Sequence, residues 1–259
     1  FTGGYVMFNM IDLTDKKILI TGASSGMGAE TARLCSKLGA KIVMVARRED
    51  KLIEVEKTLE GSGHRYYVFD LSNVEQIESF IKQIVSECGA FDGFVHSAGI
   101  TSMRPLRLLS VDVNRAVMDI NYFAFVEIIR CITKRNCFNE GLSIVGISSI
   151  SAKRGNKSKT AYCASKAAMD AAVKCVAKEL APKGIRANSV NPAWIKTDIY
   201  NQFLDKGGDS EDGNNIFARQ YLGLGEPIDV ANMIAYLLSD AARFITGSNI
   251  DVDGGSLSS

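Results

Sequence analysis

A tyrosine and a lysine stand four residues apart in the stretch Tyr162-Cys163-Ala164-Ser165-Lys166. This spacing is about one helical turn, so both side chains would lie on one face of a helix. An unperturbed phenol has a pKa of about 10, too high for efficient proton exchange near neutrality. A nearby ammonium group favours the phenolate and lowers that pKa, so the pair could donate or accept a proton. The spacing alone is a weak signal, because such pairs occur by chance on exposed helices.

Two further polar residues precede this pair in the sequence. Ser149 stands thirteen residues before Tyr162, just after a predicted strand, and its hydroxyl could hydrogen-bond a substrate carbonyl and orient it. Asn121 lies inside a predicted helix, where asparagine is a mediocre residue, so local structure does not explain it. It could hold a water that passes protons onward from Lys166. The alternative is a buried amide that satisfies the backbone.

Short apolar runs rich in β-branched residues alternate with longer helical patterns along the chain. The runs are almost continuously hydrophobic, as strands of a sheet covered on both faces must be. Strands are predicted at Lys17–Thr21, Lys41–Ala46, Arg65–Phe69, Phe91–His96, Leu142–Ser148, Ile185–Val190 and Asn249–Val252. Helices are predicted at Gly26–Leu38, Arg48–Leu59, Asn73–Cys88, Val111–Arg135, Thr160–Leu180 and Pro227–Ser239. A capping box of Ser72 and Glu75 is expected to open the third helix.

This alternation predicts an α/β fold, namely a single doubly wound Rossmann-type domain over residues 1–259. Its seven-stranded parallel sheet would carry helices on both faces. Residues 1–10 are interpreted as an N-terminal extension or a tag remnant. Residues 192–225 contain glycine clusters and the polar run Asp205–Asn215. They follow the sixth strand, where a substrate would enter, so they are interpreted as a substrate-side loop or lid.

Composition narrows the class of protein. With 46% hydrophobic and 23% charged residues, the chain is typical of globular proteins. Its net charge of +1 argues against nucleic acid or a membrane as partner and favours a small molecule. The six cysteines form no C-x-x-C pair and there are only two histidines, so we expect no metal and a reducing, cytoplasmic compartment. No run is long enough for a transmembrane helix.

Glycines cluster between the first predicted strand and the first predicted helix. Glycine here lets the backbone approach a pyrophosphate, whose charge then meets N–H groups at a helix N-terminus. A glycine-rich turn alone is weak evidence, but this one has the required strand–turn–helix context. The sequence therefore predicts a dinucleotide site, and its expected residues are Thr21, Gly22, Ser24, Ser25, Gly26, Met27 and Gly28.

The end of the second predicted strand selects between the nicotinamide cofactors. A carboxylate there binds the adenosine ribose, whereas a basic residue accommodates a 2′-phosphate. Arg47 and Arg48 follow this strand, and acidic residues come only later, so NADP(H) is favoured over NAD(H). The alternative is that both arginines are solvated residues at a helix start.

Two other strand ends are expected at the same site. The carboxylate of Asp70, which precedes Leu71, could accept a hydrogen bond from the adenine amine. Ser97-Ala98-Gly99 are small, so the backbone could pass close to the cofactor. His96, just before them, is assigned no catalytic role, because a lone histidine is more often a satisfied core residue.

Together these residues resemble the short-chain dehydrogenase/reductase family in its compact form. The resemblance runs from Lys17 to Gly255, nearly the whole chain. Each motif is modest alone, but jointly and in this order they are highly specific. The motifs are T-G-x-x-x-G-x-G at Thr21–Gly28, Asp70, Ser97-Ala98-Gly99, Asn121, Ser149, Tyr162, Lys166, Asn191-Pro192, Thr197, Ile245-Thr246-Gly247 and Asp253-Gly254-Gly255.

The resemblance implies an Asn-Ser-Tyr-Lys catalytic tetrad, carried here by Asn121, Ser149, Tyr162 and Lys166. In the family the tyrosine and lysine also contact the cofactor. The nicotinamide carboxamide is held after the Asn-Pro strand end, which implies Pro192, Ile195 and Thr197. Members are usually homotetramers or homodimers built on the two longest helices, here near 111–135 and 160–180.

Three departures from the family pattern leave this tetrad untouched. His96-Ser97 replaces the usual Asn-Asn, which weakens the role of that strand end. Ala193 stands where glycine is common. Asn136–Gly141 precedes the fifth predicted strand without the usual basic-glycine turn.

Within the family the chain looks most like the 3-oxoacyl-(acyl-carrier-protein) reductases, which implies a carbonyl or alcohol substrate and makes acyl-carrier protein a candidate partner. A matching basic patch could comprise Arg130, Lys134, Arg135, Lys174 and Lys178. Glu127 and Glu179 reduce the net positive charge of this patch, and the basic residues could equally well belong to solvated helix faces. Alternatives are a sugar, polyol or other small-alcohol dehydrogenase of the family and, less favoured, a non-catalytic nucleotide sensor or an epimerase or dehydratase.

The substrate pocket is expected between the end of the fifth strand and the segment after the sixth. Its predicted walls include residues near Met103 and Leu106. They mix apolar and polar side chains, which indicates a moderately apolar ligand. The main lining residues are predicted to be Ser149, Ile150, Ser151, Trp194, Tyr200 and Phe203.

Overall fold

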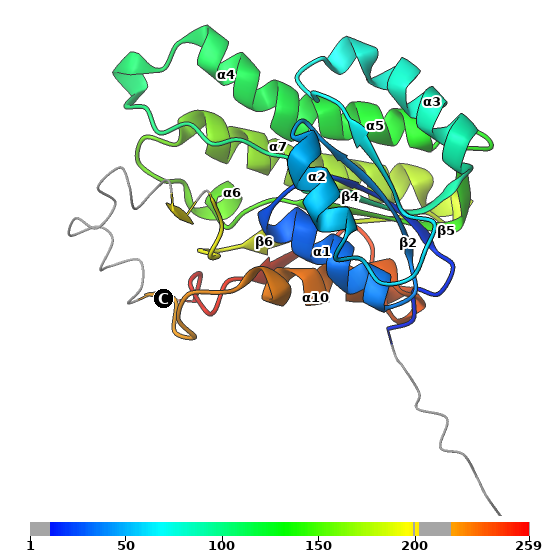
Figure 1. Ribbon diagram of the computed structural model, residues 1–259. Helices are drawn as coiled ribbons and strands as arrows, with labels where there is room; N and C mark the ends of the chain where they lie inside the picture. Colours follow the sequence, from blue (N-terminus) through cyan, green and yellow to red (C-terminus); the bar gives the residue numbers. More distant parts are fainter. Residues whose placement is uncertain (1–10, 199, 202–218, 259) are drawn as a thin grey trace, which may run out of the picture.

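The computed structural model describes residues 11–198, 200–201 and 219–258 (Figure 1). Within them, parallel strands form one seven-stranded sheet in the order β3-β2-β1-β4-β5-β6-β7, which confirms the predicted fold class. The strands are β1 Lys17–Thr21, β2 Lys41–Ala46, β3 Arg65–Val68, β4 Phe91–His96, β5 Phe138–Ile147, β6 Arg186–Pro192 and β7 Asn249–Val252.

Helices cover both faces of this sheet. In Figure 1, α1 (Gly26–Lys37) and α10 (Pro227–Leu238) lie below it, with α3 (Ile77–Cys88), α5 (Ala124–Ile132) and α7 (Thr160–Leu180) above. The other helical segments are α2 Glu49–Glu56, α4 Val111–Met118, α6 Ser151–Arg154 and the short turns η1 Val74–Gln76, η2 Leu106–Leu108, η3 Asp119–Phe123, η4 Ala181–Lys183 and η5 Asp240–Ala242. None of the described helices is long and apolar enough to cross a membrane.

Each covered face has its own apolar core. Ile18 and Ile20 of β1 point to the α1 and α10 side, whereas Leu19 points to the α3, α5 and α7 side. Alternate side chains of one strand enter opposite faces, so both faces of a central strand must be apolar. This explains the continuous hydrophobic runs in the sequence.

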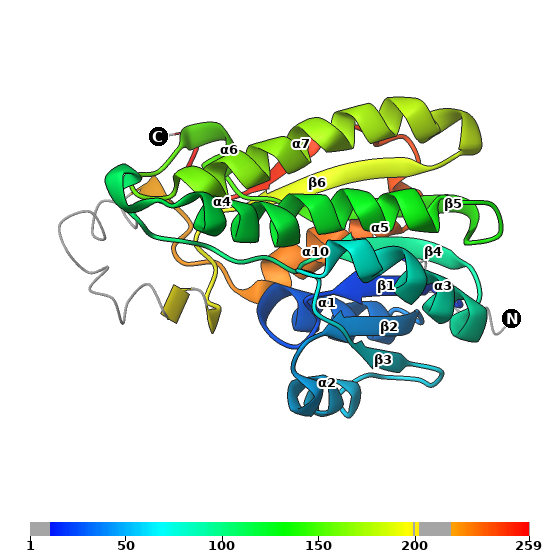
Figure 2. The ribbon, with the colours of Figure 1, turned by 90° about the horizontal axis from the view of Figure 1, so that it is seen from above.

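The order of the strands creates a crevice beside β1. Thr21, the last residue of β1, pairs with Val45 of β2 on one side and His96 of β4 on the other. The chain leaves β1 toward α1 below the sheet, and it leaves β4 toward the helices above it (Figures 1 and 2). Ligands of doubly wound sheets bind at such a point, outside the carboxyl ends of the strands.

The predicted helix 111–135 is not one regular helix. Residues Asp119–Phe123 form a π-helical turn between α4 and α5. A π-turn accommodates one more residue than an α-turn, and such turns occur frequently at functional sites. This turn contains Asn121, whose side chain is fully buried.

Two other local predictions were wrong. The segment after Ser72 begins as the 3₁₀ turn η1, α3 starts only at Ile77, and no side chain caps either start. The capping box is absent because the Ser72 N–H donates to Asp70 Oδ1 at 3.0 Å instead. Strand β5 begins at Phe138 rather than Leu142, with an irregularity in its pairing to β4.

Candidate active site

Four predicted catalytic side chains converge at the carboxyl end of the sheet. Ser149 follows β5, Tyr162 and Lys166 stand one turn apart on α7, and Asn121 lies in the π-turn. A Cβ atom at Gly99 would lie 3.3 Å from Asn121 Oδ1 and 3.4 Å from Lys166 Nζ. Lys166 Nζ is 5.8 Å from the centre of the Tyr162 ring. The structure therefore brings residues from three separate segments into one cluster.

Lys166 is almost fully buried at the base of this cluster. Its Nζ donates a hydrogen bond of 2.7 Å to the carbonyl oxygen of Ile147, the last residue of β5. Burial lowers the pKa of Lys166 to about 8, and the charge of Asp170 acts in the opposite direction. The ammonium is thus held next to β5, and it loses its proton more readily than a solvated lysine.

The phenol of Tyr162 behaves differently from the prediction made for it. Burial raises its pKa, and a hydrogen bond with the Ser149 side chain opposes that change. The expectation of a lowered pKa was wrong for this structure, because burial outweighs any attraction from the Lys166 ammonium, which donates to the Ile147 carbonyl. Tyr162 is therefore protonated near neutrality, the state that can donate a proton.

The two adjacent serines at the end of β5 have different partners. Ser148 Oγ donates to the backbone oxygen of Lys166 at 3.1 Å and ties the strand to α7. Ser149 Oγ accepts the Ser151 N–H at 3.1 Å, and its hydroxyl also bonds with Tyr162. Only Ser149 is joined to the phenol, which agrees with its choice as the substrate-orienting residue.

Asn121 is engaged mainly with backbone. Its Oδ1 accepts the Ile100 N–H at 2.9 Å, and its Nδ2 donates to Ile100 O at 3.0 Å and to Ser165 Oγ at 2.9 Å. Of the two sequence-based hypotheses, this geometry favours the amide that satisfies the backbone over the water carrier. Asn121 fixes the irregular segment that continues from Gly99.

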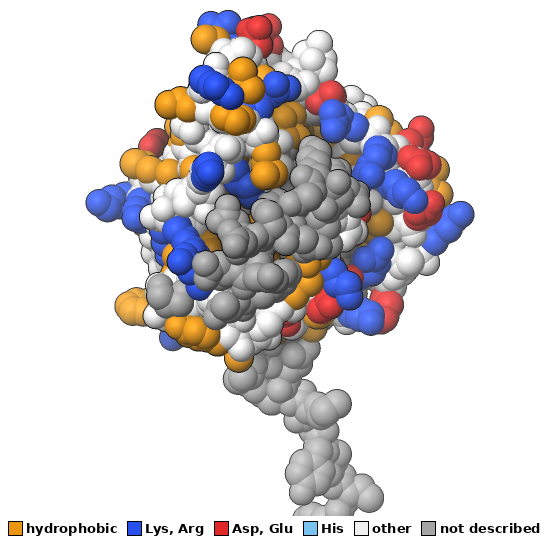
Figure 3. Space-filling view, turned by 90° about the vertical axis from the view of Figure 1, so that its left-hand side faces the viewer, with side chains coloured by type: hydrophobic (Ala, Val, Ile, Leu, Met, Phe, Trp, Pro, Cys, Tyr) orange, Lys and Arg blue, Asp and Glu red, His pale blue; other side chains and the backbone are white. Residues whose placement is uncertain are grey.

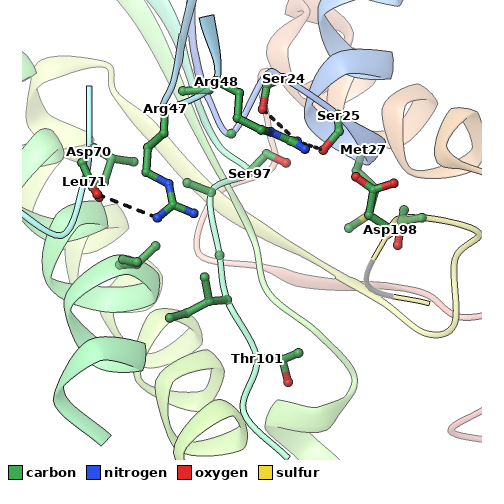
Figure 4. Close-up of a pocket in the computed structure, with 18 of the residues that line it drawn as sticks. Ser24, Ser25, Met27, Arg47, Arg48, Asp70, Leu71, Ser97, Thr101 and Asp198 are labelled. Atoms are coloured by element: carbon green, nitrogen blue, oxygen red, sulfur yellow. Dashed lines mark hydrogen bonds and ion pairs between the residues drawn. The ribbon is translucent and has the colours of Figure 1, made fainter. Parts of the chain in front are cut away.

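A cleft of about 430 Å³ opens beside these groups, over the end of β1 (Figure 4). Of the predicted cofactor residues, those that line it are Gly22, Ser24, Ser25, Gly26, Met27, Arg47, Arg48, Asp70, Leu71, Ser97, Ala98, Gly99 and Thr197. Sequence reasoning did not assign six further lining residues, which are Ala46, Phe69, Ile100, Thr101, Ile120 and Asp198. They could be recognised only once the strand order was known.

The glycines of this cleft have the properties that a bound dinucleotide requires. Gly22 has φ +68°, and a Cβ there would lie 2.5 Å from the Ala98 nitrogen. A Cβ at Gly28 would lie 2.4 Å from the Gly22 oxygen, so Gly28 allows α1 to pack closely and does not line the cleft. The first turn of α1 thus faces the cleft with N–H groups that have no intrahelical acceptor. These residues fit a nicotinamide dinucleotide.

Thr21 does not line the cleft, contrary to the prediction. It is 1% exposed, and its Oγ1 bonds with Nδ1 of His96 at 3.0 Å. The other ring nitrogen of His96 bonds with the Ile120 oxygen at 3.1 Å. Burial, followed by the charge of Lys166, lowers the pKa of His96 to about 3, so the ring is neutral. His96 is a satisfied core histidine, as expected.

The two arginines after β2 occupy different parts of the cleft. Arg48 Nη2 donates to Ser24 Oγ at 3.2 Å and to Ser25 Oγ at 2.8 Å. Arg47 Nη1 lies 3.8 Å from Asp70 Oδ2 in an exposed ion pair. Figure 4 shows both guanidinium groups pointing into the cleft from one side. Positive charge thus lies on one side of this cleft.

A second cleft of about 590 Å³ adjoins Tyr162. Ser149, Ile150, Ser151, Trp194 and Tyr200 line it as predicted, together with Pro192, Ile195, Thr197 and Met103, whereas Leu106 does not. Phe203 and most of the predicted lid lie outside the described residues. Thr101 lines both clefts, and its Oγ1 is a buried hydroxyl with no hydrogen-bond partner among the described residues.

The lining of this second cleft is more basic than the sequence-based interpretation suggested. Besides the apolar residues it contains Arg154, Lys157, Lys159 and Arg219. Three of these come from the run Lys153–Lys159, which lies between Ser149 and Tyr162 in the sequence. That position was the available signal, and the prediction of a moderately apolar ligand overlooked it.

The chain is similar to known enzymes over nearly its whole length. Residues 22–256 match the family model described as Enoyl-(Acyl carrier protein) reductase. The 3-oxoacyl-[acyl-carrier-protein] reductase FabG of Rickettsia felis is 37% identical over 250 residues, which cover 96% of this chain and 99% of that protein. The L-xylulose reductase of Caenorhabditis elegans is 34% identical, with 94% and 96% covered.

Solved structures agree with these matches. One described as an NAD(P)-dependent gluconate 5-dehydrogenase from Beutenbergia cavernae, with bound NADP, has a TM-score of 0.89 and 28% identity, covering 97% of this chain and 100% of that one. The 4-hydroxyisoleucine dehydrogenase complexed with NADH has a TM-score of 0.85 and 31% identity, covering 95% and 100%.

Proposed function

Because the chain belongs to the short-chain dehydrogenase/reductase family of oxidoreductases, we propose that it uses NADP(H) to interconvert a carbonyl group and a secondary alcohol. The observation that carries this proposal is the cluster of Tyr162, Ser149 and Lys166, of which Tyr162 and Ser149 line the second cleft. A non-catalytic sensor would not need a phenol, a hydroxyl and a buried ammonium in such a cluster.

In this mechanism the substrate oxygen lies between Ser149 and Tyr162. The Ser149 hydroxyl orients the carbonyl, and the protonated phenol of Tyr162 donates its proton to the oxygen. A bound nicotinamide would supply or accept the hydride. Lys166 stabilises the phenolate that Tyr162 then becomes, because an ammonium favours a neighbouring anion. In the alcohol direction Tyr162 accepts the proton.

The preference for NADP(H) is supported by Arg47 and Arg48. A 2′-phosphate carries more than one negative charge and matches the planar donors of a guanidinium. Arg47 pairs with Asp70, and this ion pair is long and exposed, so a phosphate would displace it at small cost. Asp198 lies on the far side of the cleft (Figure 4).

For the substrate we propose a 3-oxoacyl thioester of an acyl-carrier protein, the substrate class for which several relatives are named. The second candidate is a sugar, polyol or other small alcohol. It is favoured by the polar side chains of the second cleft, such as Ser151 and Asn156, which bond with each other at 2.8 Å. Relatives named for xylulose and aldohexose belong to that class.

We further propose a homodimer or homotetramer built on the helices near 111–135 and 160–180. The outer side of α7 exposes small residues, Ala164, Ala167 and Ala171, which would allow two copies of the helix to approach closely. Val111 and Phe123 beside it are 63% and 46% exposed. Light scattering coupled to size exclusion would measure the mass of the assembly, and a monomer at micromolar concentration would contradict this.

The function is tested by a screen that follows the absorbance of NADPH. Carbonyl compounds and 3-oxoacyl thioesters are supplied in turn, with NADH in place of NADPH as a comparison. We expect turnover of at least one class with NADPH, and none in the variant Tyr162→Phe. Oxidation of NADPH that is equal in both proteins would reject the proposed acid–base role.

A further inference from the structure

Asp170 is a buried carboxylate on α7 that takes no direct part in the proposed proton transfer. Figure 3 shows charged side chains of both signs on one face of the molecule, where water solvates them. Asp170, in contrast, is only 8% exposed, and it is the one aspartate or glutamate among the buried side chains of the described residues. Removing a carboxylate from water costs free energy unless hydrogen bonds and an opposite charge compensate for it. The surroundings of Asp170 supply both.

Strands β6 and β7 hold this carboxylate in a defined orientation. Its Oδ1 accepts the Ser189 hydroxyl at 2.8 Å, and its Oδ2 accepts Asn191 Nδ2 at 3.1 Å. Asn249 Nδ2 in turn donates to Ser189 Oγ at 2.7 Å and to the backbone oxygen of Asp170 at 3.4 Å. An ionised carboxylate only accepts hydrogen bonds, and both of its side-chain partners donate one. The network therefore suits the charged form.

The opposite charge is that of Lys166, which stands one helical turn before Asp170 on the same side of α7. The ammonium bonds with the Ile147 carbonyl and the carboxylate bonds with β6, so the two groups interact as charges and not as a direct ion pair. Between buried groups such an attraction is weakened less than in water. The charge of Asp170 accordingly opposes the effect of burial on the pKa of Lys166.

The other side chains around Lys166 carry no negative charge near neutrality. His96 of β4 is neutral, because burial and the charge of Lys166 lower its pKa to about 3. Tyr162, one turn before Lys166, keeps its proton because burial raises the pKa of its phenol. Asn121, the residue of the π-turn nearest to the ammonium, is an amide that does not titrate. Among these described neighbours, Asp170 is therefore the one that can balance the ammonium.

We infer that Asp170 is a positioning residue for the proposed reaction, because its carboxylate is the counter-charge that keeps the Lys166 ammonium protonated inside the buried site. An amide could bond with Ser189 and Asn191 as well and would cost less to bury, so the hydrogen bonds alone do not explain a carboxylate here. The inference rests on the proposed function, since the ammonium matters for catalysis only if it stabilises the phenolate of Tyr162.

Asp170→Asn tests this role, since it removes the charge with little change of shape. Lys166 should then lose its proton at a lower pH. With NADPH and the carbonyl compound that the screen selects, kcat should fall on the alkaline side of its pH profile about one pH unit or more below the fall in the parent protein.

Two variants serve as controls for this pH profile. Ser189→Ala removes one hydrogen bond of the network but not the charge. Glu179→Gln removes an exposed charge of the same helix, about 20 Å along α7 from Lys166. In both, the alkaline fall of kcat should stay within about 0.3 pH units of the parent protein.

The pKa of Lys166 can also be measured without turnover, by urea unfolding. In the folded protein it lies at about 8, below the ordinary value of 10.5, so between these values the unfolded chain binds more protons. The free energy of unfolding therefore rises with pH above the folded pKa, relative to the variant Lys166→Met, which lacks this group. The rise should begin near pH 8 in the parent protein. It should begin about one pH unit or more lower in Asp170→Asn, compared with Lys166→Met/Asp170→Asn.

An onset in Asp170→Asn within about 0.3 pH units of the parent onset would overturn the inference, and so would an equal shift in Glu179→Gln. If Asp170→Asn does not fold, Lys166→Met/Asp170→Asn decides. Folding restored by loss of the ammonium supports the counter-charge, whereas failure of both variants would show that Asp170 is only structural.

The two measurements also separate this inference from the proposed function. A lowered onset of the rise in Asp170→Asn, without turnover of any carbonyl by the parent protein, would reject the proposed function alone. Turnover by the parent protein together with an unshifted onset would reject the role of Asp170 alone.

Discussion

Asn121 and Ile100 are joined by a reciprocal pair of hydrogen bonds, in which the side-chain amide of one accepts from and donates to the backbone of the other. A side-chain amide offers a donor and an acceptor side by side, which an ionised carboxylate cannot do. The pair fixes the segment after Gly99, which contributes Ile100 and Thr101 to the lining of the first cleft and Thr101 and Met103 to that of the second. Asn121 is therefore placed to act by positioning, through the backbone that it holds.

Replacing Asn121 by aspartate tests this role with little change of shape. Asn121→Asp keeps the acceptor for the Ile100 N–H but turns the donor toward Ile100 O and Ser165 into a second acceptor. We expect a loss of about 2–4 kcal/mol in the free energy of unfolding, from a buried repulsive contact. The variant should also lose activity. Urea unfolding and kcat/KM measure both.

The surface variant Asn73→Asp provides the control for that experiment, because Asn73 is exposed and its side chain caps nothing. It should unfold like the parent protein. If Asn121→Asp were equally harmless, the positioning role would be wrong.

Tyr162→Phe removes one oxygen from the cluster. We expect kcat/KM to fall by about three orders of magnitude or more, because neither Ser149 nor Lys166 can replace the acid. The dissociation constant of NADPH should change less than about three-fold, since the ring remains in place. Cofactor fluorescence measures binding, and Tyr221→Phe, at a tyrosine that is 63% exposed, controls for loss of a phenol. Substantial turnover by Tyr162→Phe would contradict the mechanism.

The adjacent serines should respond differently to alanine. Ser149→Ala removes the hydroxyl that meets Tyr162, and kcat should fall by about two orders of magnitude. Ser148→Ala removes a buried bond to the Lys166 backbone, which should cost about 1 kcal/mol of stability and change kcat much less. Thermal unfolding and steady-state kinetics separate the two. The reverse ranking in kcat would exchange their roles.

Arg47→Ala and Arg48→Ala test the choice of cofactor. Each variant should raise the dissociation constant of NADPH by roughly 10- to 100-fold, which is the effect of losing a charge-assisted hydrogen bond. The dissociation constant of NADH should change much less. Titration of reduced cofactor fluorescence gives the four dissociation constants. Equal effects on the two cofactors would indicate that the arginines are solvated residues of the helix start.

His96 makes stability depend on pH in a defined direction. Its pKa is lowered from 6.5 to about 3 in the folded protein. At pH values between these two, the ring therefore binds a proton in the unfolded chain but not in the folded protein. Stability from this group is complete above about pH 6.5 and is lost as the pH falls through the window toward 3. Between pH 7 and pH 5 the loss should be about 2 kcal/mol.

His96→Asn, which keeps a polar side chain without this titration, isolates the effect from that of other groups. The difference in unfolding free energy between the parent and His96→Asn should therefore shift with pH across this range. Urea unfolding at pH 5, 6 and 7 measures it. A difference that is constant with pH would show that the ring does not titrate on unfolding.

Periodicity and strand-end chemistry predicted much of this molecule. All seven strands lie close to their predicted positions, because buried parallel strands are the most hydrophobic runs of the chain. Of the four proposed catalytic residues, Ser149 was indicated by a strand end and Tyr162 and Lys166 by their helical spacing, whereas Asn121 was indicated by its poor fit to a helix interior. The start of β5 could not be predicted, because Phe138–Glu140 are mostly polar and lie where the pairing with β4 is irregular.

Features that depend on the surroundings of a side chain could not be predicted from the sequence. The direction of the pKa change at Tyr162 depends on burial and on where the Lys166 ammonium points, and spacing contains neither. Thr21 belongs to the glycine-rich motif but faces His96. Three cations of the second cleft come from the short stretch 154–159, but their position in its lining, together with Arg219, depends on folding.

The π-turn at Asp119–Phe123 determines where this helix can change in length. Each residue of an α-helix rotates the chain by about 100°, so α-helical bonding of the same five residues would swing everything beyond them around the axis. Because the π-turn holds one residue more than an α-turn, deleting one of these five residues would leave Phe125, Ile128 and Ile132 facing the sheet. Random deletion libraries should consequently yield folded variants that are shortened by one residue within this stretch, but none that are shortened within α5.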